Sequence, residues 1–384
     1  MKKIYAFISI IILTSTLHCG ENKMKKRLQP EKIKLFHDIV SISGIAKEDT
    51  LAGLNYRGEF VEIKFDEKKI QIKTVLSKFP HEDCVEIKSD NESNIVWSLR
   101  GRGLYVLDLV TKQKGHCVVS SDGDDKVVNS QLIDPEKKII MVEFSRLGPG
   151  IAGGIAGFIY ILYDLVNDKI IYESPLYSGD FYRLKDDFLF FGKLKSEKGK
   201  LLFWNIRNQI LEVRSDNNLI KKLNKLLIEV WSKSKPISLI SRTMLGTGKV
   251  NGETVYYSIR WDEKFEDVKV EPIILQRPDG NDMDVAFEFS GDGKWVKTFR
   301  YPYSNGREMI PELMFYHVSD IYPQGLSMPI LAGMSFESTQ GAFLNHSKWG
   351  TCYAQLIGSH TLHVYKLNDG LKLLAEQAKS AVSP

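Results

Sequence analysis

Residues that mark disulfide frameworks, metal sites and nucleic-acid interfaces are scarce in this sequence. Only 4 of its 384 residues are cysteines, and 8 are histidines. Lysine and arginine exceed aspartate and glutamate by a formal net charge of only +4. A nucleic-acid-binding domain instead concentrates a basic excess on one face. We therefore expect no nucleic-acid partner.

The sequence also lacks the short motifs of common enzymes. It contains no GxSxG, HExxH or P-loop pattern, each of which places reactive or phosphate-binding groups at a fixed spacing. Gly148, Gly150 and Gly153 match GxGxxG, but the strand-like segment GFIYILYDL follows them, where a dinucleotide site needs a helix. No acidic cluster has the spacing of an EF-hand loop. We expect no catalytic residues, no metal and no cofactor, which favours a binding protein over an enzyme.

One long apolar run is present, near the N-terminus. Lys2 and Lys3 precede it, it extends from Ile4 to Leu17, and Cys19 follows closely. This order is typical of a secretory signal, and the run is shorter than the roughly 20 apolar residues that span a bilayer. We therefore assign residues 1–19 to an export signal. No later stretch of the sequence is long enough to span a membrane.

Cys19 at the end of this signal resembles the acylated cysteine of bacterial lipoproteins. The resemblance implies that a lipid on Cys19 anchors the protein in a membrane of the cell envelope, on the periplasmic side or at the outer surface. Basic residues between positions 23 and 27 would add attraction to anionic head groups, within a polar tether over residues 20–34. Cleavage near the small residues at 14–16 is the alternative and would give a soluble periplasmic protein.

The other three cysteines leave their pairing open. If Cys19 carries a lipid, Cys84, Cys117 and Cys352 remain, which is an odd number for an exported chain. A Cys84–Cys117 disulfide is one option. Buried free thiols are the other option and the one we favour.

The rest of the chain has the composition of an all-β protein. Short apolar runs rich in Tyr, Phe, Ile and Val alternate with Gly, Asn and Asp turns. A unit of four strands recurs about every fifty residues, a period typical of propeller blades. Its third strand is the clearest, in seven copies: Phe60–Phe65, Leu104–Leu109, Ile159–Leu165, Leu201–Ile206, Thr254–Ile259, Leu313–Val318 and Leu362–Leu367. We predict a seven-bladed β-propeller of four-stranded antiparallel blades over residues 35–377, followed by a tail at 378–384.

The turn between the first two strands of the unit supports this fold. The segment FSGDGKW at Phe289–Trp295 resembles the first-hairpin signature of Tol-system and Trp-Asp-type propeller repeats. Asp and Gly suit such a turn because they tolerate positive φ. Looser copies begin at Ser89, Ile133 and Leu344. The resemblance implies a fold but no activity, because propellers host unrelated functions.

One segment departs from the strand pattern. Residues 216–233 place Leu219, Leu223, Leu226 and Val230 at helical spacing. We predict an amphipathic helix inserted between the fourth and fifth blades, with its apolar stripe on the propeller. A helix that binds a partner is the alternative.

Positive residues recur at the predicted tips between second and third strands. They are Arg57, Arg100, Arg102, Arg146, Lys195, Arg300, Arg307 and His360. Because these tips share one face of a propeller, the cations could form a ring for an anionic ligand, such as a carboxylate-bearing glycan or an acidic protein loop. Pairing with nearby acidic residues, or simple solvation, is the plainer alternative.

An enzymatic alternative rests on acidic residues that could converge in the central channel. They are Asp83, Asp124, Asp180, Asp282 and Asp284. Two carboxylates in a channel would suit a hydrolase or lyase acting on a sugar or lactone. We favour a binding or scaffolding module whose partners are the membrane, through the lipid anchor, and an envelope protein or an anionic glycan.

Overall fold

A computed structural model describes much of the chain beyond residue 27. The described residues are 28–66, 70–76, 86–89, 91–100, 103–118, 126–134, 137–147, 155–173, 178–184, 187–193, 201–205, 210–214, 228–230, 237–238, 243–250, 253–261, 268–273, 285–300, 303–304, 307–308, 312–317, 326–329 and 340–382. Within these ranges nearly every element is a β-strand, and the helix is α3 (Leu367–Val382).

The described strands form seven antiparallel sheets of three to five strands, which we number in chain order. Sheet 1 comprises β2 (Ile39–Gly44), β3 (Thr50–Asn55), β4 (Phe60–Phe65) and β5 (Ile70–Leu76). Sheet 2 comprises β6 (Ile95–Arg100), β7 (Gly103–Asp108) and β8 (Lys114–Val118). Sheet 3 comprises β9 (Lys126–Asp134), β10 (Ile139–Leu147), β11 (Ile155–Asp164) and β12 (Lys169–Glu173).

The remaining sheets follow the same order. Sheet 4 comprises β13 (Ser178–Leu184), β14 (Asp187–Lys193), β15 (Leu201–Asn205) and β16 (Ile210–Arg214). Sheet 5 comprises β17 (Ile228–Val230), β18 (Ile237–Ser238), β19 (Thr243–Val250), β20 (Glu253–Trp261) and β21 (Val268–Ile273). Sheet 6 comprises β22 (Val285–Phe289), β23 (Trp295–Arg300), β26 (Glu312–His317) and β27 (Leu326–Pro329). Between β23 and β26 in the chain, β24 (Tyr303–Ser304) and β25 (Arg307–Glu308) form a separate two-stranded sheet.

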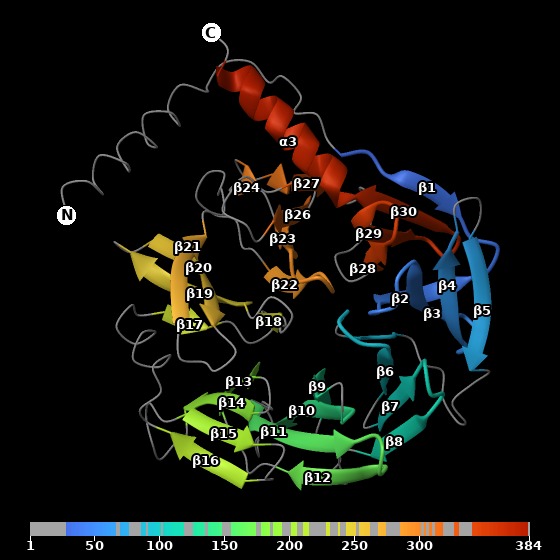
Figure 1. Cartoon of the computed structure of the whole chain (residues 1–384). Coiled ribbons are helices and arrows are strands. Elements are labelled where there is room, and N and C mark those ends of the chain that lie inside the picture. The colour runs from blue at the N-terminus through green and yellow to red at the C-terminus, as the bar shows by residue number, and fades with distance from the viewer. Residues whose placement is uncertain are drawn as a thin grey trace.

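Sheet 7 joins the two ends of the described chain. It comprises β28 (Gln340–His346), β29 (Gly350–Ile357), β30 (Thr361–Lys366) and the first described strand, β1 (Glu31–Lys34). β1 lies antiparallel to β30, with Glu31 opposite Val364 and Lys34 opposite Thr361. Figure 1 shows the seven sheets following one another around a ring, with α3 beside sheet 7.

The repeat predicted from the sequence agrees with the strand order. The seven predicted third strands correspond to β4, β7, β11, β15, β20, β26 and β30. Each of these strands takes the third place in its sheet. In sheet 2 the first place is held by Lys88, which forms a bridge with Trp97 of β6. The signature turn also has the expected conformation, since Gly293 has a φ of 66°, and the backbone N–H of Trp295 donates to Ser290 Oγ at 3.0 Å.

The structure departs from the sequence-based boundaries at three places. Ile228–Val230, inside the predicted helix, form strand β17 opposite Gly246–Gly248, because two β-branched residues flanking Glu229 suit a strand. The rest of residues 216–233 lies outside the described residues. Glu31–Lys34, assigned to the tether, form β1, and α3 occupies residues where the last blade and the tail were expected. The fourth strand of sheet 7 therefore comes from the start of the chain.

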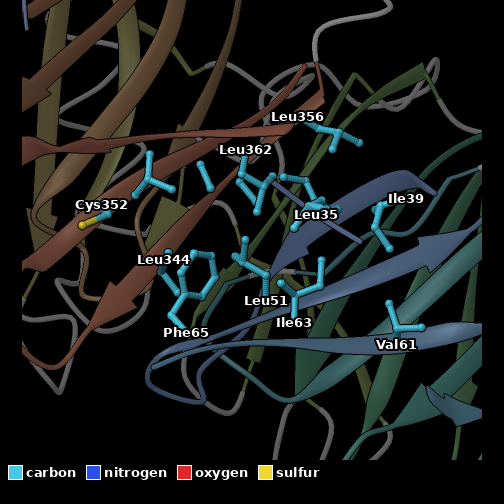
Figure 2. Packing of buried hydrophobic residues seen from close by; sticks show 14 residues of the cluster. Leu35, Ile39, Leu51, Val61, Ile63, Phe65, Leu344, Cys352, Leu356 and Leu362 are labelled. Carbon is cyan, nitrogen blue, oxygen red and sulfur yellow. The ribbon is translucent and has the colours of Figure 1, made fainter. Parts of the chain in front are cut away.

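Neighbouring sheets pack face to face through apolar side chains. One cluster joins sheets 7 and 1 and includes Leu344 and Cys352 from the first and Leu51 and Ile63 from the second, all buried (Figure 2). Equivalent clusters join sheets 1 and 2, sheets 2 and 3, and sheets 6 and 7. A sheet buried on both faces explains why its strands are apolar in successive positions.

Within the described part of the chain, no helix combines the length and the apolar character needed to cross a bilayer.

Candidate functional site

The β3–β4 tip presents Tyr56 and Arg57 to solvent. Asn55 fixes this tip, because its Oδ1 accepts hydrogen bonds from the backbone N–H of Arg57 and of Glu59, both at 3.0 Å. Gly58 has a φ of 74°, which glycine adopts without steric cost. The side chains of the two residues between Asn55 and Gly58 are therefore held outward rather than packed.

The neighbouring β29–β30 tip lies against the connection between β1 and β2. The backbone N–H of Leu35 donates to the carbonyl of His360 at 2.6 Å, and that of Ile39 donates to the carbonyl of Ser359 at 2.9 Å. Asp38 in this connection contacts His360, with 2.7 Å between Nε2 and Oδ1. The carbonyl of Asp38 also accepts from the N–H of Tyr56 at 3.2 Å. Hydrogen bonds thus bring two tips and one connection together.

Aromatic and aliphatic side chains are exposed at this junction. Phe36 is 88% exposed and Tyr56 is 60% exposed. We call the surface formed by Phe36, His37, Val40, Tyr56, Arg57 and His360 the Phe36 surface; all six residues are exposed. Exposed aromatic side chains grouped with a cation are typical of interaction sites.

Arg57 gives the Phe36 surface a permanent positive charge. Its Nε donates to the Tyr56 hydroxyl at 2.9 Å, and its guanidinium lies 5.4 Å from the centre of the same ring. The Tyr56 hydroxyl and the Glu59 carboxylate raise the pKa of Arg57 above its ordinary value. The guanidinium keeps further N–H donors that a carboxylate can accept in bidentate geometry.

Among the predicted cations with described side chains, Arg57 and His360 lie on neighbouring tips that both contact the β1–β2 connection. Arg100, Arg146 and Arg300 lie at or near the ends of β6, β10 and β23, next to the predicted tips, and Arg307 lies in β25. Arg102 and Lys195 lie outside the described residues. Arg57 and His360 both have an acidic neighbour. Nε2 of His360 lies 2.7 Å from Asp38 Oδ1, and the Glu59 carboxylate acts on Arg57. The ring as a whole remains a prediction.

The predicted channel acids are not brought together in the described part of the chain. Asp180 lies in β13, opposite Phe191. Asp83, Asp124, Asp282 and Asp284 lie outside the described residues, so the enzymatic alternative stays untested. Among the described residues, no group of three or more His, Cys, Asp or Glu side chains could hold a metal ion.

A buried charge network lies where sheets 2, 6 and 7 meet, and the sequence analysis did not identify it. Asn91 Nδ2 donates to Glu288 Oε1 at 2.8 Å and to the carbonyl of Phe289 at 3.1 Å. Lys297 Nζ donates to the other oxygen of Glu288 and lies 3.4 Å from the Tyr353 hydroxyl. Burial lowers the pKa of Lys297, but Glu288 and Tyr353 outweigh that effect and raise it, so the lysine stays charged.

The residues missed by sequence analysis differ in the signal they carried. Lys297 lies two residues after Trp295 in β23, so both side chains point to the same face of the strand. This period-2 pattern was the signal that could have identified Lys297 as buried. Phe36 and Asp38 lie in a connection between strands, where no periodicity distinguishes an exposed aromatic residue from a buried one. Cys352 was expected to be a buried free thiol, and it is one; burial raises the pKa of its thiol to about 12.

Comparison with known proteins supports the fold and adds no family. No protein-family model matches the sequence, and no curated protein matches it significantly. The β-propeller domain of Cps50 (Swd1) from Myceliophteria thermophila matches with a TM-score of 0.52 and 11% identity, over 88% of this chain and 99% of that one. A chain of the mitotic checkpoint complex matches with a TM-score of 0.47 and 9% identity, over 90% of this chain and 94% of that one. Together with the ring of antiparallel sheets, the first similarity shows that this chain has a β-propeller fold.

Proposed function

We propose that this protein is an exported, lipid-anchored β-propeller that binds an envelope protein through the Phe36 surface. The observation that carries the proposal is the 88% exposure of Phe36 in the β1–β2 connection, which hydrogen bonds join to two hairpin tips. Tyr56 and Arg57 beside it belong to the residue types that dominate binding energy at protein interfaces. The partner would supply an apolar pocket for Phe36 and a carboxylate for Arg57.

We further propose that the propeller has seven blades, one for each numbered sheet. The support is the sevenfold recurrence of the third strand and the pairing of β1 with β30, which gives the last sheet its fourth strand. A ring closed by strands from both ends of the chain leaves no sheet without a neighbour on either side. Buried apolar clusters between four pairs of neighbouring sheets support this arrangement.

The anchor in this proposal is a lipid on Cys19. Its support is the order of basic residues, apolar run and cysteine in the sequence. Mass spectrometry of the mature N-terminus tests it directly. An acyl mass on Cys19, lost in Cys19→Ala together with membrane association, supports the anchor; an unmodified terminus near Leu17 contradicts it.

Affinity capture from detergent-solubilised envelopes tests the binding site. We expect the parent chain to recover a specific protein. The amount of that protein should fall at least tenfold when Phe36→Ala is combined with Arg57→Ala. Lys372→Ala is the matched control, because that side chain is exposed on α3, away from the Phe36 surface. Equal recovery by the double variant and the control would reject this surface as the binding site.

A further inference from the structure

Three aliphatic side chains are exposed at the end of the ring opposite to the Phe36 surface. In the β7–β8 and β11–β12 turns, Val110 is 69% exposed and Val166 is 51% exposed, and Ile170 in β12 is 44% exposed. Gln113 Nε2 joins the two turns, because it donates to the carbonyls of Leu165 at 3.0 Å and of Val166 at 3.1 Å. Figure 1 shows the ends of sheets 2 and 3 side by side there. The three side chains therefore lie over one edge of the ring.

The turn conformation does not require an apolar residue at position 110. Asp108 Oδ1 fixes the β7–β8 turn by accepting from the backbone N–H of Val110 at 2.8 Å and of Thr111 at 3.2 Å. These bonds use only the backbone of residue 110, and turn positions are usually polar. An exposed aliphatic side chain at such a turn points to contact with an apolar or interfacial environment.

Lysines surround these aliphatic side chains. Lys112, Lys114 and Lys169 are exposed next to them. At the same end of the ring, Lys47, Lys294 and Lys348 are exposed in turns between first and second strands.

Several acidic side chains at this end are engaged by neighbouring turns. Asp108 binds Lys138, with 2.6 Å between Oδ2 and Nζ, and Asp49 accepts from Ser347 Oγ at 2.7 Å. Glu48 and Asp66 are exposed at this end as well. Two acidic residues share the β11–β12 turn with Val166, since Asp168 is exposed and Asp164 is half-buried. The excess of positive charge on this surface therefore lies in the β7–β8 turn, with Lys112 and Lys114.

The chain that carries Cys19 joins the ring at this same end. β1 runs from Glu31, opposite Val364, to Lys34, opposite Thr361, and so runs toward the His360 tip. Its start consequently lies at the end opposite to the Phe36 surface. Leu28, just before β1, packs with Leu371 of α3 against the cluster between sheets 6 and 7.

We propose that the Val110 surface, formed by Val110, Val166, Ile170, Lys112, Lys114 and Lys169, rests on anionic lipid head groups. It is a second membrane contact beside the lipid on Cys19, and it builds on the anchoring proposed above. A single acyl chain binds membranes only marginally and needs a second signal, and lysines near the bilayer surface supply attraction to anionic lipid. This contact directs the Phe36 surface away from the membrane.

Sedimentation with vesicles tests the proposal without relying on acylation. The chain beginning at Gly20 contains every described element and lacks Cys19, so binding reports the propeller surface alone. We expect it to bind phosphatidylglycerol–phosphatidylethanolamine vesicles at least tenfold more strongly than phosphatidylcholine vesicles. Val110→Asp combined with Val166→Asp should lower the partition coefficient about tenfold, and Lys112→Glu combined with Lys169→Glu should lower it similarly.

Lys34→Glu is the matched control, because it changes the charge by −2, as the two valine substitutions do together, at an exposed site on the opposite end. Unchanged binding by this control, with loss in both double variants, supports the proposal. Absence of binding to anionic vesicles, or equal binding by all variants, overturns it and leaves the Val110 surface as a protein contact. The lipid anchor is tested separately, because mass spectrometry of the mature N-terminus shows whether Cys19 carries an acyl group.

Discussion

His346 illustrates how one side chain can couple the stability of this protein to pH. Its Nδ1 accepts a hydrogen bond from the backbone N–H of Lys348 at 3.1 Å, so the folded state uses the neutral ring. Burial lowers the pKa of His346, and the nearby Asp49 carboxylate opposes that effect only in part. Burial likewise lowers the pKa of His317 and of His363.

Stability should therefore fall on mild acidification. A histidine with a lowered folded-state pKa contributes stability that is present above its unfolded pKa of about 6.5 and is lost as the pH falls through its folded pKa. We expect the Tm to drop between pH 7.5 and pH 5, with a smaller drop in His346→Gln, because that position no longer takes up a proton. Calorimetry across this range measures both, and a drop in His346→Gln as large as in the parent would contradict the role of His346.

Asn91 joins a turn of sheet 2 to sheet 6, and its φ of 63° lies in the left-handed region, which asparagine tolerates better than alanine. Its two donated hydrogen bonds go to a charged oxygen and a carbonyl from sheet 6, and truncation leaves both acceptors without this donor. We expect Asn91→Ala to lower the free energy of unfolding by about 2 kcal/mol. Urea denaturation measures this, and Asn167→Ala, at an exposed turn, should change it by less than about 0.5 kcal/mol.

At the scale of elements, the Glu288–Lys297 pair joins β22 to β23 beneath Tyr353 of β29. Removing Lys297 leaves the half-buried carboxylate of Glu288 without its counterion. We expect Lys297→Met to cost about 2–3 kcal/mol, and Lys297→Met combined with Glu288→Gln to recover part of that loss. The exposed Lys294→Met serves as control. A double variant less stable than Lys297→Met alone, in the same urea titration, would show that the pair does not act as one unit.

Neighbouring sheets are also joined through the turns between their first and second strands. The N–H of Ala46 donates to the carbonyl of Ser93 at 2.8 Å, and the N–H of Asp49 donates to the carbonyl of Asn345 at 2.8 Å. Thr351 Oγ1 donates to Asp292 at 2.6 Å. Such bonds extend from sheet 6 through sheets 7 and 1 to sheet 2. They fix the turns that carry Lys47, Lys294 and Lys348.

Strand periodicity predicted the elements of this fold better than their boundaries or the site. Third strands such as LYVLDL and LHVYKL are recognisable because burial on both faces removes polar residues from successive positions. β1 escaped detection because EKIK is polar on its exposed face, and its partner β30 lies at the far end of the sequence. Arg57 and His360 were predicted from their positions in tips between strands. Phe36 is recognised as a candidate binding residue only from its exposed fraction in the structure.

At the scale of the molecule, β1 closes the ring, so its packing should control global stability. Ile33 packs against the cluster between sheets 7 and 1, whereas Lys32 is exposed. We expect Ile33→Asp to lower the free energy of unfolding by about 2–3 kcal/mol, because a carboxylate replaces packed apolar surface. Limited proteolysis should then cut at the N-terminal end first. Lys32→Asp on the same strand should behave like the parent, and equal loss in both would argue against closure by packing.

The two ends of the ring have different surfaces, and the proposed orientation of the molecule rests on their separation. The Phe36 surface groups aromatic side chains with Arg57. The Val110 surface groups aliphatic side chains with lysines and lies at the end where the N-terminal segment joins. A propeller held as we propose would present the Phe36 surface away from the lipid.

Photo-crosslinking in intact cells tests this orientation most directly. A benzophenone amino acid at position 56 in one chain, and at position 110 in another, reports what each surface contacts. We expect a protein adduct from position 56 and a lipid adduct from position 110. A lipid adduct from position 56 would contradict this orientation, and so would protein adducts without any lipid adduct from position 110.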